Sequence, residues 1–229
     1  MEEFTQPLIL TPYKSFPRSM FEQVLESVIL LFVAVDPIAL IPIFASLTQG
    51  LSKQDTKKVY IHASLVAFGI LSAFWLFGSS LLAVMGISMS SFKIIGGLFL
   101  IAIAFQMVFE QRQERRQNTA DTALDDESLQ SLAIFPLATP LIAGPGAMTA
   151  ALLLAEKRST EPLEMLINFT PIIAIILMAA IAMWLSANLA NKVSPTIITV
   201  VQKIFGILLG ALAIEFVVSG IRESFNLIG

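Results

Sequence analysis

The amino-acid sequence predicts an all-α membrane protein of six transmembrane helices, arranged as two inverted three-helix repeats. Three observations lead to this fold class: an apolar composition, six long apolar blocks, and two motifs that occur once in each half of the chain. Hydrophobic residues make up 56% of the chain and charged residues only 14%, with a mean hydropathy of +0.81. Soluble domains carry about 25% charged residues, so the composition favours a membrane protein.

Each apolar block is long enough to cross a bilayer as a helix. Crossing the hydrocarbon core takes about 20 mostly apolar residues, and a helix is required because lipid offers the backbone no hydrogen-bond partner. The alternating pattern of a membrane β-barrel is missing from these blocks. The expected spans are residues 24–47, 59–85, 92–109, 132–155, 163–189 and 197–218.

A polar segment divides the chain into halves. It reads QRQERRQNTADTALDDESLQ and has no apolar face to bury, which is typical of a solvated linker. We therefore expect a three-helix repeat over residues 1–110, a polar cytoplasmic linker over residues 111–130 and a second three-helix repeat over residues 131–229. Lysines and arginines near the span ends are slightly more numerous on the linker side, so the positive-inside rule places both termini outside the cytoplasm.

Two motifs of the first half recur in the second half in the same order. Residues 37–42 (PIALIP) in the first span match residues 140–145 (PLIAGP) in the fourth, and residues 93–96 (KIIG) in the third span match residues 203–206 (KIFG) in the sixth. A repeat with an odd number of spans enters the membrane from the opposite side in its second copy. The two repeats are therefore inverted, which is a common plan of secondary transporters.

The first and the fourth spans contain residues that break helices. A proline lacks an N–H and clashes with the carbonyl four residues earlier, and irregular backbone at membrane depth survives only where it is buried in protein or lines a wet cavity. A simple proline kink is the alternative, but the symmetric repetition favours a site, since inverted-repeat transporters bind their solutes at such breaks. The expected substrate- or ion-binding residues are Asp36, Pro37, Ala39, Pro42, Thr139, Pro140, Ala143, Gly144, Pro145 and Gly146.

Asp36 is the one acid well inside the first span. A charge at the bilayer centre costs about 2.5 to 3.5 kcal/mol on insertion scales, so this side chain should face the protein interior. Two roles stay open for it: a carrier of the coupling proton or sodium ion, or a cap for a helix that restarts at Pro37. Thr139 is its symmetric counterpart in the fourth span.

Small and basic residues predict how the third and sixth spans are placed. Glycines allow close approach of helices, and contact between these two spans within one chain is the expected use, with a homo-oligomer as the alternative. We expect Lys93 and Lys203 to reach the headgroups as anchors and Gln106 to make an interhelical hydrogen bond. The expected helix-packing residues are Gly96, Gly97, Gly206 and Gly210.

Several classes of function lack the residues that they need. The chain has no Cys and a single His, so we expect no disulfide, no metal and no cofactor. The net charge is -3 without a basic face, which excludes nucleic-acid binding. No Walker A motif for ATP is present. An intramembrane protease needs a serine with a base or two facing acids, so we do not expect an enzyme.

The proline motifs resemble those of the MarC family, which comprises six-helix inner-membrane proteins of bacteria and archaea. The family pattern in the first span is Asn or Asp followed by Pro-x-Gly-x-x-Pro-x-Phe, and residues 36–44 read DPIALIPIF, with Ala39 where the family usually has Gly. The fourth-span pattern, Pro-Leu-x-x-Pro-x-x-x-Gly-Pro, is met by residues 136–145 (PLATPLIAGP). The resemblance covers nearly the whole chain.

The resemblance implies a relationship to the lysine-exporter superfamily of small-molecule transporters. It also implies the bacterial inner membrane as the location, which makes both termini periplasmic. Some archaeal members are described as transporters of small neutral amino acids, so this substrate class is implied, with the lipid bilayer, the solute and a coupling proton or sodium ion as partners. The expected function is a secondary transporter of a small polar solute. The alternative is a non-transporting membrane partner or assembly factor.

Overall fold

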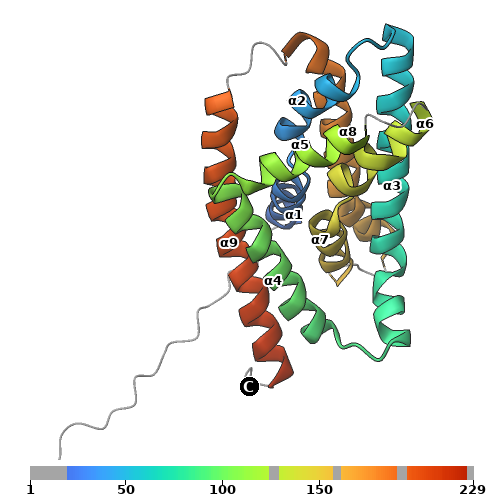
Figure 1. Ribbon diagram of the computed structural model, residues 1–229. Coiled ribbons are helices and arrows are strands. Elements are labelled where there is room, and N and C mark those ends of the chain that lie inside the picture. Colours follow the sequence, from blue (N-terminus) through green and yellow to red (C-terminus); the bar gives the residue numbers. More distant parts are fainter. Residues whose placement is uncertain (1–19, 124–128, 157–160, 190–194, 226–229) are drawn as a thin grey trace, which may run out of the picture.

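The computed structural model describes residues 20–123, 129–156, 161–189 and 195–225 of the chain. Within these ranges every regular element is a helix, and the helices form one elongated bundle (Figure 1). Five helical segments of the described residues are long and apolar enough to cross a membrane, and a bent helix pair makes a sixth if it is counted as one span. This confirms the prediction of an all-α protein with several membrane spans.

Four of the spans lie close to their predicted positions, and the first consists of two helices. The first span is made of α1 (Met20–Val35) and α2 (Pro37–Leu47), and it is followed by α3 (Lys53–Val84), α4 (Met89–Val108), α8 (Pro162–Leu189) and α9 (Pro195–Ser224). Serines begin two of these helices by capping free backbone donors. The hydroxyl of Ser52 accepts from the Asp55 N–H at 3.1 Å, and that of Ser88 accepts from the Ser91 N–H at 3.1 Å.

The first span breaks at Asp36, between α1 and α2. Asp36 has φ 56° and ψ 68°, the left-handed conformation, which Asp tolerates better than most residues. Pro37 then occupies the first turn of α2, where its missing N–H costs nothing because those donors are free in any case. Pro42 lies inside α2 without ending it. The break is therefore set by Asp36 and Pro37 and not by the second proline.

The fourth span is the bent pair. It consists of α6 (Leu129–Leu132), the irregular helical segment η1 (Ala133–Ile142) and α7 (Pro145–Glu156), and its two arms meet at an angle of 62°. Phe135 and Thr139 are extended inside η1, with φ near -130° and ψ near 125°. Each of them precedes a proline, whose ring disfavours the helical conformation of the residue before it.

The third and sixth spans, α4 and α9, pack against each other in antiparallel orientation. A β-carbon at Gly97 would lie 2.7 Å from the carbonyl oxygen of Ala213, and one at Gly206 would lie 3.1 Å from that of Ala104. Only glycine allows such close backbone approach. Gly210 lies in ordinary contact distance of Ala104, whereas Gly96 faces Thr149 of α7. Three of the four expected glycines therefore lie between α4 and α9, and Gly96 does not.

The two halves contact each other reciprocally, as inverted repeats do. The second part of the first span, α2, packs on α8, and the second part of the fourth span, α7, packs on α3. Lys203 at the start of α9 pairs with Glu110 at the end of α4 at 2.6 Å. Lys93 at the start of α4 pairs with Glu223 at the end of α9 at 2.5 Å. Lys93 is only 5% exposed, so the expectation that it anchors in the headgroups is wrong.

The segment expected to be a solvated linker contains a helix, α5 (Gln111–Ala123), which lies across the bundle (Figure 1). The interpretation as fully solvated is wrong for Arg112 and Arg116, which are only 7% and 8% exposed. Residues four apart share one face of a helix, and this face enters the bundle where the broken spans leave carbonyl groups without partners. The later part of the expected linker, residues 124–128, lies outside the described residues.

Candidate functional site

The two broken spans meet at the side chain of Arg116. One of its terminal nitrogens donates to the carbonyl oxygen of Val35 at 2.8 Å, in the break of the first span. The same nitrogen donates to the carbonyl oxygen of Leu141 at 3.3 Å, in the irregular part of the fourth span. The other terminal nitrogen lies 3.5 Å from the carbonyl oxygen of Asp36. One arginine of α5 therefore joins the two breaks.

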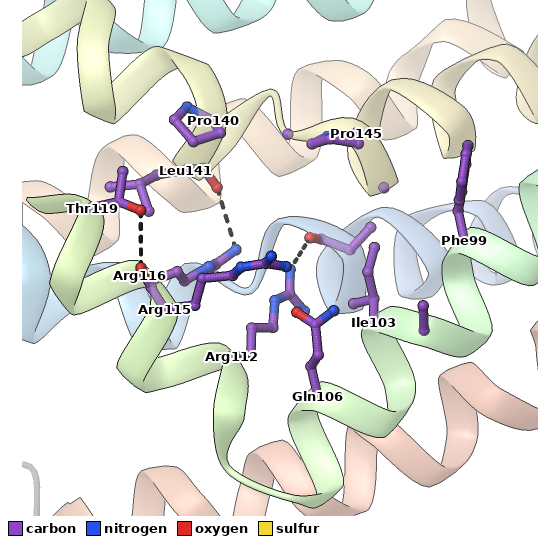
Figure 2. A pocket seen from close by; sticks show the side chains of 14 residues that line it. Phe99, Ile103, Gln106, Arg112, Arg115, Arg116, Thr119, Pro140, Leu141 and Pro145 are labelled. Atoms are coloured by element: carbon purple, nitrogen blue, oxygen red, sulfur yellow. Dashed lines mark hydrogen bonds between the residues drawn. The ribbon is translucent and has the colours of Figure 1, made fainter.

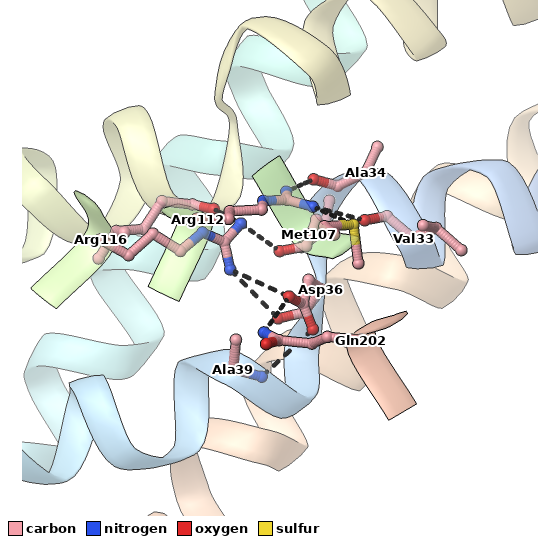
Figure 3. Close-up of polar contacts among 10 residues, drawn as sticks. Val33, Ala34, Asp36, Ala39, Met107, Arg112, Arg116 and Gln202 are labelled. Atoms are coloured by element: carbon pink, nitrogen blue, oxygen red, sulfur yellow. Dashed lines mark hydrogen bonds and ion pairs between the residues drawn. The ribbon is translucent and has the colours of Figure 1, made fainter. Parts of the chain in front are cut away.

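Arg112 binds the end of α1 in the same way (Figure 3). It donates to the carbonyl oxygen of Val33 at 3.1 Å and to that of Ala34. The sequence explains why these oxygens have no hydrogen-bond partner within the helix. Pro37 has no N–H to offer Val33, and the turn at Asp36 ends the regular ladder. A buried carbonyl without a donor costs about 1 to 3 kcal/mol, so the guanidinium groups stabilise the break.

Asp36 faces the same cluster and caps α2. One carboxylate oxygen accepts from the backbone N–H of Ala39 at 3.3 Å. The other accepts from the side-chain amide of Gln202 at 2.9 Å and lies 3.8 Å from a terminal nitrogen of Arg116. All three side chains are buried. The structure thus gives Asp36 the capping role and the interior position together, and whether it also carries a coupling ion stays a prediction.

The cluster holds more positive than negative charge. Arg112 and Arg116 each bring one guanidinium, which remains charged in proteins, whereas Asp36 brings one carboxylate. Buried charges are costly unless they are paired or hydrogen-bonded. The carbonyl dipoles of both breaks offset part of the cost of burying the two guanidinium groups, and they hold α5 in its position across the bundle.

A cavity of about 550 Å³ lies beside this cluster, between α4, α5 and the start of α7 (Figure 2). Its polar wall consists of Gln106 and Thr119 together with Arg112, Arg115 and Arg116. Figure 2 shows the arginines extending from α5 toward the segment that contains Pro140 and Pro145. Gln106, expected to bond between helices, instead contributes to the cavity wall.

Four of the expected binding residues line this cavity, namely Pro140, Gly144, Pro145 and Gly146. The space around the two glycines leaves no room for a β-carbon, because Gly144 lies against the Pro140 carbonyl oxygen and Gly146 against Ile103. Their small size therefore keeps the start of α7 close to the cavity. The other six expected residues do not line the cavity, and they are Asp36, Pro37, Ala39, Pro42, Thr139 and Ala143.

Four functional candidates escaped the sequence reasoning. They are Arg112, Arg115 and Arg116 on α5, and Gln202 on α9. The signal for the two buried arginines was their spacing of four residues, which places both on one helix face. The composition of the segment concealed that face, since no apolar residue marks it. Among the described residues, no group of three or more His, Cys, Asp and Glu side chains is placed to hold a metal ion.

Comparisons with known proteins place the chain among integral membrane proteins. A family model described as "MarC family integral membrane protein" matches residues 21–225. A UPF0056 membrane protein of Methanocaldococcus jannaschii is 32% identical over 86% of this chain and 85% of its own length. The UPF0056 membrane protein YhcE of Escherichia coli is 32% identical over 85% of this chain and 90% of its own length. No solved structure matches.

Proposed function

Because this chain belongs to the MarC family of integral membrane proteins, we propose that it is a secondary transporter of a small polar solute. One observation carries the proposal: the broken first and fourth spans converge on a buried polar cluster beside a cavity of about 550 Å³. A binding site of drug-like or smaller molecules has a volume of roughly 300 to 1,000 Å³, so a small solute fits this space.

The energetics of the breaks favour a binding site over a structural kink. A kink needs only one proline, yet here both spans lose regular backbone and two buried arginines compensate for it. Irregular backbone at membrane depth survives where it is buried in protein or lines a wet cavity, and inverted-repeat transporters bind their solutes and ions at such breaks. The inverted contacts of α2 with α8 and α7 with α3 also suit alternating access, in which one repeat moves against the other.

The proposed substrate class is the small neutral amino acids, which rests on the resemblance of the proline motifs. The proposed location is the bacterial inner membrane, with a proton or a sodium ion as the coupling ion. We propose no enzymatic activity for the chain. A non-transporting membrane partner remains the competing function, and it requires no solute flux.

Flux through purified protein tests the proposal. Proteoliposomes are loaded or bathed with a panel of labelled amino acids, with and without proton and sodium gradients. We expect uptake of at least one small neutral amino acid above protein-free liposomes. Ala102→Trp fills the cavity from α4 and should abolish this flux. Ala73→Trp places the same bulk on an exposed site of α3 and should leave it unchanged. No flux of any solute would favour the non-transporting partner.

A further inference from the structure

Arg115 is an exposed arginine of α5 that lines the cavity beside the two buried ones. Arg112 and Arg116 bind backbone carbonyl groups and face Asp36, so their donors are largely committed. Arg115 lines the same cavity, and among the described residues its guanidinium has no ion-pair partner within salt-bridge distance. Among the described residues that line the cavity, none is Asp or Glu. An anionic group that entered would therefore meet the Arg115 guanidinium, whose donors are not committed to backbone carbonyls as those of Arg112 and Arg116 are.

The start of α7 adds backbone donors on the opposite wall. Gly144, Pro145 and Gly146 line the cavity, and the first intrahelical bond of α7 runs from the Met148 N–H to the Gly144 carbonyl at 2.9 Å. Pro145 has no N–H, so the helix donors before Met148 are those of Gly146 and Ala147, which have no acceptor within the helix. A helix N-terminus also carries a partial positive charge. This wall therefore favours the same sign of ligand as the arginines do.

We propose that the cavity binds the carboxylate group of the transported solute, with Arg115 as the main cation and the first turn of α7 as the second donor. This inference deepens the proposed transport function and rests on it. The remaining wall, which includes Phe99, Ile103 and Pro145, is apolar and suits a short aliphatic remainder. Because the described part of the cavity wall has three arginines and no acidic side chain, the carboxylate and not an ammonium group is what the site recognises.

Three small probes separate these two groups in equilibrium binding to the purified full chain in detergent. L-alanine carries both groups, propionate carries only the carboxylate, and L-alaninamide carries only the ammonium. We expect alanine and propionate to bind with similar affinity and alaninamide to bind at least about tenfold more weakly, since a hydrogen bond to a charged group contributes about 1.5 to 3 kcal/mol. Equal binding of alaninamide and alanine would overturn the proposal, as would no binding of alanine and propionate.

Substitutions assign the effect to one residue. Arg115→Gln should weaken the binding of alanine and propionate about tenfold or more, and Arg115→Lys should recover part of it, because the charge remains while the forked geometry is lost. Arg222→Gln removes an exposed arginine from the last turn of α9 and should bind as the unaltered protein does. Size-exclusion elution verifies that each variant is folded. Unchanged affinity in Arg115→Gln would overturn the assignment.

Two further arms separate the proposal from its alternatives. Binding is repeated in nanodiscs of phosphatidylcholine alone and with added phosphatidylglycerol, and loss of alanine binding only with the anionic lipid would overturn the proposal by naming a lipid phosphate as the occupant. Flux distinguishes the underlying function. Arg115-dependent propionate binding without flux of any solute would reject transport and keep the site, whereas equal alanine flux in Arg115→Gln would keep transport and reject the site.

Discussion

Arg116 has the most bonds to lose among the buried side chains of the site. It donates to backbone carbonyls of both broken spans and lies beside Asp36. Removing it leaves these oxygens without their donor and the Asp36 carboxylate without its nearby cation, although each was desolvated when the protein folded. The long side chain of Arg116 thus supplies hydrogen bonds that the two breaks lack, in a bilayer where water cannot replace them.

Arg116→Gln should lower the midpoint of thermal unfolding in detergent by about 6 to 20 °C. Breaking a buried ion pair by removing one partner costs about 3 to 5 kcal/mol, and 1 kcal/mol corresponds to about 2 to 4 °C for a chain of this size. Lysine at the same position keeps the charge but cannot reach two carbonyls in a fork. Arg116→Lys should therefore lower the midpoint by an intermediate amount. Arg222→Gln serves as the control, and an equal midpoint in Arg116→Gln would contradict the assignment.

Asp36→Asn tests whether the acid carries a coupling ion or only supports the break. A purely capping role would let Asn serve almost as well as Asp, because both side chains accept from backbone N–H groups. The structure changes this expectation, because Asn would keep an acceptor for Ala39 but leave Arg116 without a counter-charge. We expect Asp36→Asn alone to lower the midpoint of thermal unfolding. The double variant Asp36→Asn with Arg116→Gln should recover part of this loss, because it no longer leaves an unpaired charge at position 116.

Transport by the Asp36→Asn variant answers the coupling question separately. At equal protein recovery, loss of gradient-driven accumulation together with retained exchange is expected if Asp36 binds the coupling proton or sodium ion. Full accumulation would remove Asp36 from the coupling step. The freed carbonyl groups of the breaks would then be the candidate ion ligands.

At the scale of elements, the close packing of α4 on α9 depends on glycine at defined positions. A β-carbon at Gly97 would lie 2.7 Å from the carbonyl oxygen of Ala213, which belongs to the backbone and cannot turn away. A β-carbon at Gly69 of α3, in contrast, would have no neighbouring atom within 4 Å. Close packing therefore requires glycine at position 97 but not at position 69, although both residues lie in long apolar helices.

Gly97→Ala should therefore destabilise the protein, whereas Gly69→Ala should not. Overpacking costs about 1 to 3 kcal/mol, while alanine in place of glycine in a free helix position gains about 0.5 to 1 kcal/mol. Thermal unfolding of the two variants in the same detergent measures the difference. Equal midpoints for the pair would show that α4 and α9 are not held at the distance described above.

The elements also show what a sequence can predict for this molecule. Apolar blocks of about 20 residues are a direct consequence of bilayer thickness, so the spans were found within a few residues. The breaks were found because proline removes a donor wherever it occurs. The helix α5 was missed because its partners lie in other elements: the carbonyls at Val33 and Val35 that hold Arg112 and Arg116 are not visible in the local sequence.

The positions of the site residues were only partly predictable for the same reason. Four of the expected residues, from Pro140 to Gly146, line the cavity because the fourth span bends there. Those of α2 do not, since the left-handed turn at Asp36 directs that helix elsewhere. Which residues of two symmetric motifs face a common space depends on the packing of both repeats, and one sequence does not fix that packing.

At the scale of the whole molecule, the bent fourth span decides how many times the chain crosses the membrane. With the bent pair as one span, the described residues contain six crossings, and with a re-entrant pair they contain five. One ion pair and one contact between elements favour six. Glu156 at the end of α7 pairs with Lys93 at the start of α4, whereas η1 contacts α5, which follows the end of α4. The bent pair therefore runs from one end of α4 toward the other.

Topology reporters distinguish the two counts. From the positive-inside rule we expect a reporter after α5 to signal the cytoplasm, and three further crossings would bring the C-terminus to the opposite side. Reporter fusions inserted between residues 123 and 129 and after residue 229 should thus give opposite signals, with the N-terminal fusion matching the C-terminal one. A re-entrant pair leaves only two crossings after the insertion and gives the same signal at both positions. In that case the two repeats would not be inverted copies, because the second would lack a crossing that the first has. The alternating movement of one repeat against the other would then have no symmetric partner, so agreement of the two fusions would reject the six-span architecture together with the mechanism that depends on it.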